Sequence, residues 1–437
     1  MKQRDGFTSK FGFLVSCIGA ALGLGNIWMF PYKLGTYGGA AFLIPYLIFV
    51  SILSTTGLIT EFSFGRFYKG GSYTGITTIF QKRNLKGGKI IGLLPALGIT
   101  GIFMFYCVVI GWVLKYFALS ISGKISSIDA STYFNDFSGT SSSIPWFLLA
   151  VLITLLVVHS GIAKGIEKLN KIALPILLVL FIILLIKSLS LDGAMKGVEY
   201  LITPRWTDLL NIKTWVMALG QAFFTVSLTG CGMVVYGSYI NEDYDIPTSS
   251  LQTAFFDTLA GLMASFIIIP AVFAFGLDPA GGPSLLFITI PKVFQSMPYS
   301  SLFSTIFFIS IIFAAISSSV SMLEGPVETL LAATGLTRKK ISTYVAIICF
   351  ILGIPLAINT TMFIKFADFI TIILSPLCVL FVSIIFFYFM SKKDILTAIN
   401  QGSKRPVGSW FIFLGKYIFV PVTIIIIIFG IIYGGIG

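Results

Sequence analysis

Residues 16–31, SCIGAALGLGNIWMFP, lie inside an uncharged run, 11–32, that is long enough to cross a bilayer. The run is a poor helix, because Gly19, Gly23 and Gly25 cluster at its middle and each costs about 1 kcal/mol relative to alanine. Hydrocarbon replaces no lost hydrogen bonds, so a broken membrane helix must be buried in protein beside a polar cavity. There its freed carbonyls can bind a cation and its freed amides a carboxylate.

Close helix packing is the alternative, because small residues four apart, such as Gly19 and Gly23, let membrane helices approach without a break. A second stretch favours the broken helix. Thr229-Gly230-Cys231-Gly232 interrupts another apolar segment half a chain later. Paired interrupted spans in matching positions of two halves indicate a binding site at the interface between the repeats.

The composition is that of a polytopic membrane protein, with 56% apolar and 11% charged residues. The net charge of +12 follows from topology and indicates no nucleic-acid partner. With the N-terminus in the cytoplasm, most of the 29 Lys and Arg residues fall in inner segments. The five cysteines all lie in apolar segments without CxxC spacing, so neither a metal site nor a disulfide framework is indicated.

Eleven apolar segments predict an all-α protein whose C-terminus lies outside the cytoplasm. Residues 277–298 are too broken to span and predict a short helix on the outer face. We expect one membrane transport domain over 1–437, with inverted repeats at about 11–188 and 213–389 and an extra helix at about 409–434. The expected segments are 11–34, 40–65, 90–120, 145–160, 166–188, 213–239, 249–276, 299–334, 341–358, 361–389 and 409–434.

Several motifs follow one another in an order that resembles the neurotransmitter:sodium symporter family of LeuT-like transporters. They are GLGNIWMFP (23–31), YGGAAFLIPY (37–46), GRF (65–67), GIAKGIEKLNKIALP (161–175), GQAFFTVSL (220–228), YGSY (236–239), AAISSS (314–319) and ADF (367–369). The length resembles an eleven-helix bacterial branch that includes transporters of tyrosine and other hydrophobic amino acids. The resemblance implies a LeuT-like 5+5 inverted repeat with discontinuous helices 1 and 6, a multi-pass protein of the bacterial inner membrane, and sodium-coupled amino-acid uptake.

A carboxylate in an apolar segment marks the first of two expected sodium positions. Asp257 lies in the seventh segment, and an intramembrane acid is a functional-site hypothesis by default. The alternative is a carboxylate that only hydrogen-bonds to neighbouring serines and threonines. The resemblance implies that the ligands are the Ala21 carbonyl, the side chains of Asn26, Thr225 and Asp257, and the substrate carboxylate.

The resemblance places the second sodium between the carbonyls of Gly19 and Leu22 and a site on the eighth helix formed by Ala314, Ser317 and Ser318. The alternative for these serines is a hydrogen bond back to the carbonyl four residues earlier.

Tyr106 matches the family tyrosine whose hydroxyl binds the substrate carboxylate, although a lone membrane tyrosine often only packs or anchors. By the same resemblance, amides near Leu24 and Gly25 bind that carboxylate, carbonyls near Phe224 and Ser227 accept from the ammonium, and Tyr106 and Phe224 form a lid. The other expected substrate contacts are Ala20, Ile102, Gly230, Ser318, Ser321 and Met322.

Gly230 stands where many relatives carry a bulky side chain, so its hydrogen should enlarge the cavity. We therefore expect a large hydrophobic or aromatic L-amino acid, with tyrosine or tryptophan favoured over leucine or methionine. Asp257 supplies a fixed negative charge beside the first sodium, so we also expect two sodium ions and no chloride.

The gates depart from the family pattern. Met29 replaces the outer arginine while Asp368 remains, which leaves water, a main-chain amide or Lys365 as partners of this acid. Arg4 and Phe7 match inner-gate positions, although Arg4 can equally be a topogenic charge. The inner acid aligns with Ala332, so Glu328, one turn earlier, becomes its candidate substitute.

Two further features are candidate gating elements. Glu61 matches a carboxylate that binds amides freed by the helix breaks, or else it pairs with Arg66. Gly165 and Pro175 bracket the start of helix five and suggest local unwinding that admits water to the second sodium.

A secondary transporter is the leading interpretation. A binding or sensing protein that does not cycle is the alternative, supported only by Met29 and Ala332 at the gates. Broken-helix sites in both halves suit alternating access better than a channel. The sequence shows no nucleophile with a base, no metal cluster and no phosphate loop, which argues against an enzyme.

Overall fold

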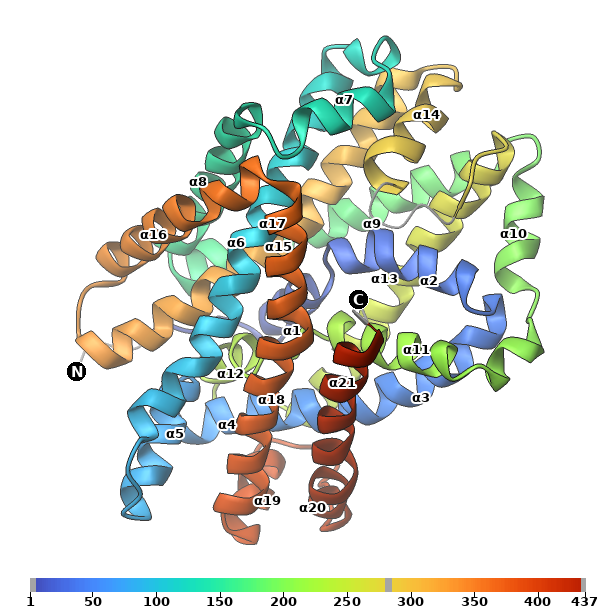
Figure 1. Ribbon diagram of the computed structural model, residues 1–437. Helices are drawn as coiled ribbons and strands as arrows, with labels where there is room; N and C mark the ends of the chain where they lie inside the picture. The colour runs from blue at the N-terminus through green and yellow to red at the C-terminus, as the bar shows by residue number, and fades with distance from the viewer. Residues whose placement is uncertain (1–4, 280–284, 434–437) are drawn as a thin grey trace.

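The computed structural model describes residues 5–279 and 285–433, and within these ranges the chain forms helices and no strands (Figure 1). Nine helices of the described chain are long and apolar enough to cross a membrane. They are Gly39–Tyr68 (with α3, Leu43–Leu53, and α4, Ile59–Tyr68), Gly88–Ile121 (α6), Ser141–His159 (with α8, Ile144–His159), Ile162–Leu189 (with α9, Lys168–Leu189), Ile246–Ala274 (α13), Ser300–Thr334 (α15), Arg338–Ile358 (α16), Thr360–Phe389 (with α17, Thr360–Asp368, and α18, Ser375–Ile384) and Trp410–Tyr433 (with α20, Trp410–Leu414, and α21, Val420–Tyr433).

Two broken helices accompany these nine. Only the first passes the same test of length and apolarity as a bent span, which gives up to ten spans in the described chain, so the count of eleven stays a prediction. The first consists of α1 (Lys10–Ala21) and the helix Gly25–Thr36, which includes α2 (Phe30–Thr36), and its two parts are bent by 57°. The second consists of α11 (Ile212–Thr225) and α12 (Gly232–Gly237). The all-α, LeuT-like fold predicted from the sequence is confirmed, whereas the repeat boundaries at 11–188 and 213–389 stay a prediction.

Helices α6 and α15 run side by side through the middle of the protein (Figure 1). In the most apolar stretch of α6, 78% of the residues are buried, against 28% in that of Ile162–Leu189. Exposed side chains on α9 include Ile176, Leu178, Val179, Ile182, Ile183 and Ile186. An apolar exposed surface on so long a helix fits a lipid-facing position, so α6 and α15 form the core and α9 lies at its edge.

The first break has a local cause in the sequence. Helix α1 ends at Ala21, Leu22 adopts an extended backbone, and the chain resumes as a wide, π-helical turn over Gly25–Met29. Asn26 stabilises the gap, because its side-chain Oδ1 accepts from the amide of Gly23 at 3.1 Å. The predicted interruption near residues 19–25 is therefore present, between Leu22 and Leu24.

The second break contains two residues with positive φ, Ser227 (53°) and Gly230 (68°). Thr229 then starts α12, because its Oγ1 accepts hydrogen bonds from the amides of Gly232 (3.0 Å) and Cys231 (3.3 Å). The threonine hydroxyl thus satisfies two amides at the start of α12, whose N-cap residue Cys231 makes no side-chain cap hydrogen bond. The second predicted interruption is present as well.

Short helices close the two ends of the bundle. Helices α7 (Ala130–Phe137) and α14 (Ile290–Gln295) lie together at the top of Figure 1. Gln295 holds this end together, because its Nε2 donates to the carbonyls of Ile125 and Ile128, each at 2.8 Å. The predicted short helix within 277–298 is present at Leu285–Gln295, while residues 280–284 lie outside the described chain. The sequence analysis missed α5 (Ser72–Lys82), α10 (Ala194–Ile202) and α19 (Lys392–Asn400).

Candidate functional site

A small cavity of about 50 Å³ lies where the two broken helices face each other. Across the gap, Ser227 Oγ donates to the Ala20 carbonyl at 2.9 Å, which joins the two breaks directly. The cavity is lined by Ala20, Ala21, Gly23, Leu24, Gly25, Asn26, Ile102, Tyr106, Phe223, Phe224, Ser227, Leu228, Thr229, Ser318, Met322, Thr371 and Ser375. Nine of the eleven predicted substrate contacts belong to this lining: Ala20, Leu24, Gly25, Ile102, Tyr106, Phe224, Ser227, Ser318 and Met322.

Tyr106 lies at the first break, where the resumed half-helix presents its amides. Its hydroxyl oxygen accepts from the Leu24 amide at 3.1 Å. Gly23 makes this approach possible, because a Cβ there would lie 2.7 Å from the Tyr106 hydroxyl and 3.0 Å from Ser318 Oγ. A hydroxyl beside the amides of a helix N-terminus is suited to binding a carboxylate.

The ring of Phe224 packs against the same turn from the second broken helix. A Cβ on Gly25 would lie 2.8 Å from Phe224 Cε1, so only glycine allows this contact. Behind the ring, the Phe224 carbonyl already accepts from the Ser227 amide at 3.1 Å. Tyr106 and Phe224 therefore reach the cavity from α6 and α11, in the places expected of a lid.

Asn26, Thr225 and Asp257 form a buried polar cluster beside this cavity. Asn26 Nδ2 donates to Asp257 Oδ1 at 2.8 Å, to Thr225 Oγ1 at 3.0 Å and to the Asp257 carbonyl at 3.2 Å. Thr225 Oγ1 donates to the other oxygen of the same carboxylate. The three side chains come from three helices. Thr225 and Asp257 present oxygen atoms, the ligand chemistry that a hard cation requires, whereas Asn26 turns its Nδ2 toward them and its Oδ1 toward the Gly23 amide. The predicted first sodium ligands therefore lie together, and their binding of sodium stays a prediction.

Ser318 gathers a second set of oxygens around the first break. Its Oγ lies 3.0 Å from the Leu22 carbonyl and 3.2 Å from each of the Gly19 and Ala20 carbonyls. Ser317 instead bonds back within its own helix, since its Oγ donates to the Phe313 carbonyl at 2.8 Å. The alternative for these serines, a hydrogen bond back to the carbonyl four residues earlier, is thus present at Ser317 and not at Ser318. Ala314 is fully buried on the same helix.

Two predicted substrate contacts lie outside the cavity lining. The expectation that Gly230 enlarges the cavity is wrong, because a Cβ at this residue would meet the backbone of Cys378 at 2.7 Å. Its positive φ and this close approach explain the glycine. Ser321 Oγ donates to the Ser318 carbonyl at 2.7 Å and does not reach the cavity either.

Six lining residues were missed. Thr229 falls in the second glycine-containing break, which already marked it as a candidate. Thr371 and Ser375 are four residues apart in an apolar helix, and this spacing places them on one face. Gly23, Phe223 and Leu228 are apolar neighbours of predicted residues.

Glu61 connects the second break to α4. Its Oε1 accepts from the Gly230 amide at 2.9 Å, and the side chain is buried. Arg66 has other partners, the carbonyls of Tyr244 (2.7 Å) and Ala398 (2.8 Å). The contact to a freed amide matches the expectation for Glu61, and the alternative pairing with Arg66 is not seen.

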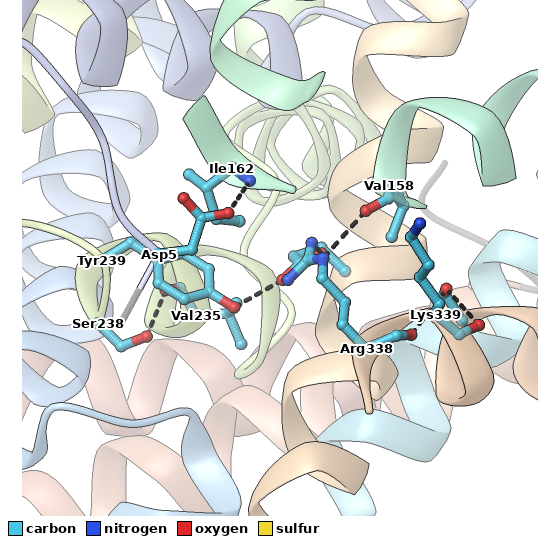
Figure 2. A network of polar contacts seen from close by, with 10 residues as sticks. Asp5, Val158, Ile162, Val235, Ser238, Tyr239, Arg338 and Lys339 are labelled. Carbon is cyan, nitrogen blue, oxygen red and sulfur yellow. Dashed lines mark hydrogen bonds and ion pairs between the residues drawn. The ribbon is translucent and has the colours of Figure 1, made fainter. Parts of the chain in front are cut away.

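The N-terminal segment is held by a polar network shown in Figure 2. Asp5 Oδ2 accepts from the Ile162 amide at 2.6 Å, and Tyr239 Oη donates to Glu324 Oε1 at 2.6 Å. The fully buried Glu324 also forms an ion pair with Arg338, whose Nε donates to the Val158 carbonyl at 3.0 Å. The sequence analysis missed this acid–arginine pair.

The other gating candidates have mixed outcomes. Arg4 lies outside the described residues. The amide of Phe7 donates to the Tyr239 carbonyl at 3.2 Å, and its ring packs edge-on against Phe13 and Tyr236. Glu328 is buried, and one of its oxygens lies 2.1 Å from where a Cβ on Gly71 would be.

At the other gate Met29 is half-buried and Asp368 exposed, with no ion pair to this acid among the described residues. Gly165 falls in a π-helical turn, Ile162–Glu167, that precedes α9. Pro175 lies inside the continuous helix Lys168–Leu189, so unwinding there stays a prediction.

Comparison with known proteins agrees with this geometry. The profile described as the sodium:neurotransmitter symporter family matches residues 4–141 and 128–434. The sodium-dependent transporter YhdH of Bacillus subtilis is 35% identical, over 96% of this chain and 96% of its own length. The sodium-dependent transporter MJ1319 of Methanocaldococcus jannaschii is 30% identical, over 98% of this chain and 90% of its own.

Among solved structures, the crystal structure of MhsT in complex with L-phenylalanine superposes with a TM-score of 0.87. The two sequences are 31% identical, and the match covers 98% of this chain and 99% of MhsT. Two opposed helix breaks, the oxygen clusters beside them and these matches lead to one conclusion: the chain belongs to the sodium:neurotransmitter symporter family.

Proposed function

We propose that this sodium-dependent symporter imports a large hydrophobic or aromatic L-amino acid, with tyrosine or tryptophan favoured, by alternating access. The observation that carries the proposal is the contact of the Tyr106 hydroxyl with the Leu24 amide, which defines a carboxylate-binding end of the cavity. The opposite lining is apolar and includes Ile102, Phe223 and Met322. MhsT, the relative with the same fold, was crystallised with L-phenylalanine.

The expected preference for a large substrate does not depend on Gly230. It rests on the apolar lining of the cavity and on the L-phenylalanine complex of MhsT. A volume of about 50 Å³ is too small for an aromatic amino acid, so the ligand has to displace neighbouring side chains. We expect Phe224 and Met322 to move, because both line the cavity and carry large side chains that can change rotamer. Leucine and methionine remain the alternative substrates.

Different residues of the site bind the zwitterion and the two sodium ions. Tyr106 and the amides at Leu24 and Gly25 orient the carboxylate, and backbone carbonyls near Phe224 and Ser227 accept from the ammonium. One sodium binds beside Asn26, Thr225 and Asp257, with the Ala21 carbonyl and the substrate carboxylate as further ligands. The other binds at the carbonyls of Gly19 and Leu22, with Ala314, Ser317 and Ser318 on α15. Because the substrate completes the first shell, sodium and amino acid bind cooperatively.

Chloride is not required in this proposal. Asp257 is fully buried and already places a carboxylate beside the first sodium position. Replacing external chloride by gluconate should therefore leave the initial rate of uptake unchanged. An uptake that collapses in gluconate would contradict this part of the proposal.

Uptake into proteoliposomes with an inward sodium gradient tests the whole proposal. Labelled tyrosine and tryptophan should enter in a saturable, sodium-dependent manner, and glycine should not compete. A preference for glycine over tyrosine and tryptophan would overturn the proposal, and so would uptake that is equally fast when potassium replaces sodium.

In cells, we expect the protein in the bacterial inner membrane with a cytoplasmic N-terminus and a C-terminus outside. Cysteine labelling at each end would check this topology.

A sensor that binds without cycling is the second candidate, and the outer gate favours it. Met29 carries no charge, and Asp368 is exposed with no ion pair among the described residues. Counterflow separates the two candidates, because only a cycling protein exchanges internal unlabelled for external labelled amino acid.

A further inference from the structure

Asn170 presents a buried oxygen that its own helix does not use. The side chain is fully buried near the start of α9, and its Nδ2 donates to the Ile166 carbonyl at 2.9 Å. Among the described residues, Oδ1 has no hydrogen-bond partner. Burying an amide oxygen without a hydrogen-bond partner is unfavourable, so a ligand that fills its lone pairs would recover that cost.

The hydrogen bond to Ile166 fixes which atom faces away from α9. If the amide were rotated to exchange its oxygen and nitrogen, Oδ1 would face the Ile166 carbonyl and two acceptors would meet. The oxygen therefore points toward the neighbouring helix α1. It lies against Gly19, since a Cβ built there would be 1.9 Å from Oδ1.

Gly19 connects this oxygen to the second sodium position. The Gly19 carbonyl is one of three that surround Ser318 Oγ, at 3.2 Å. The same Cβ position on Gly19 is 3.2 Å from Ser317 Cβ, so α1, α9 and α15 meet at this glycine. Asn170 Oδ1 and the oxygen cluster therefore share one residue, Gly19, which contacts α9 on one side and Ser318 through its carbonyl.

Glu167, the last residue of the π-helical turn before α9, is a neighbouring side chain whose oxygens do have hydrogen-bond partners. Its carboxylate accepts from the Thr8 amide (2.7 Å), Thr8 Oγ1 (2.7 Å) and Ser9 Oγ (3.1 Å), and pairs with Lys171 Nζ at 2.6 Å. Residues three apart share a helix face, so the two side chains form an oxygen-lined edge along α1. Of the two, only Asn170 has an oxygen left for a ligand.

We propose that Asn170 Oδ1 binds the sodium ion of the second position as that ion passes between α1 and α9. This inference rests on the proposed function, because it needs sodium at the second position. A carboxamide oxygen is a hard, neutral ligand suited to this cation. The same amide holds Ile166 in the π-helical turn Ile162–Glu167, so movement of that turn moves the ligand oxygen.

Sodium-dependent binding of labelled tyrosine to the full-length protein in detergent tests the inference. At saturating tyrosine, Asn170→Ala should raise the half-saturating sodium concentration about three- to tenfold, as expected for one lost oxygen ligand. Asn170→Asp keeps an oxygen at this position and loses the bond to Ile166. Its half-saturating sodium concentration should therefore stay within about twofold of the wild-type value or be lower. Ser188→Ala is the matched control, since this buried α9 hydroxyl donates to the Ile267 carbonyl at 2.7 Å, away from the site.

Each outcome of this experiment either supports or contradicts the inference. An unchanged sodium dependence in Asn170→Ala overturns the inference, and so does an equal loss in Asn170→Ala and Asn170→Asp, which would assign the effect to the Ile166 bond. If Asn170→Ala does not give a folded protein, Asn170→Leu, which fills the volume without an oxygen, carries the same expectation. A wild-type protein whose tyrosine binding ignores sodium would instead refute the proposed function, and the inference with it.

Discussion

Gly23→Ala is the sharpest perturbation that the site offers. The added Cβ would lie 2.7 Å from the Tyr106 hydroxyl and 3.0 Å from Ser318 Oγ, where ordinary contact begins near 3.4 Å. The φ of Gly23 is not in the left-handed region, so alanine meets no backbone strain. The effect therefore comes only from crowding two groups to which we assign ligand binding.

The size of the effect follows from how the crowding is relieved. The Tyr106 hydroxyl must move by about 0.7 Å to restore ordinary contact, and this lengthens its 3.1 Å bond to the Leu24 amide. Without ligand, the ring can shift into the 50 Å³ cavity at little cost. With ligand the cavity is filled, and overpacking costs about 1–3 kcal/mol, or about 5- to 150-fold in affinity.

Equilibrium binding of labelled tyrosine at saturating sodium measures this loss, and thermal unfolding of the free protein checks that the fold survives. Gly98→Ala is the matched control, because its Cβ would lie 2.9 Å from Cys378 Sγ but outside the cavity lining. This control should change the melting temperature and leave affinity within about twofold. Affinity of Gly23→Ala within twofold of wild type would refute the placement of the carboxylate at Tyr106.

Three further variants test other parts of the site. Tyr106→Phe removes the oxygen that accepts from Leu24 and should weaken tyrosine binding about tenfold or more while sodium dependence persists, and an unchanged isotherm would argue against a carboxylate contact. Asp257→Asn should raise the half-saturating sodium concentration about tenfold in the same assay, and no shift would remove this residue from the sodium shell. Arg338→Met leaves Glu324 buried without its cation and should lower thermal stability by about 2–4 kcal/mol, and Glu324→Gln in the same chain should restore part of it.

The sequence located both helix breaks because their cause is local. Clustered glycines weaken a helix wherever they occur, and a bilayer permits such a break only inside protein. The motifs around Asn26, Thr225 and Asp257 then named residues that come together in one buried cluster. Here pattern and resemblance agreed with the fold, since Asn26 and Thr225 lie next to the two breaks and Asp257 reaches both of them from the continuous helix α13.

The serine pair on α15 shows where pattern was insufficient. Ser317 and Ser318 are adjacent, and each position along a helix turns the side chain by about 100°. Ser318 consequently meets the carbonyls of the first break, whereas Ser317 bonds back to Phe313. The motif contained both serines, and only the rotation of α15 against α1 chose between them.

By itself, the amino-acid sequence determined the membrane class and the positions of the two breaks, because these depend on composition and on short stretches of chain. Its resemblance to a known family named most residues of the cavity. The tertiary structure decided the role of Gly230, which packs on the backbone of Cys378 instead of opening the cavity. It also decided that Glu324 pairs with Arg338, and that the oxygen of Asn170 lies against Gly19. Contacts of this kind join different helices, so their geometry depends on how those helices cross and rotate.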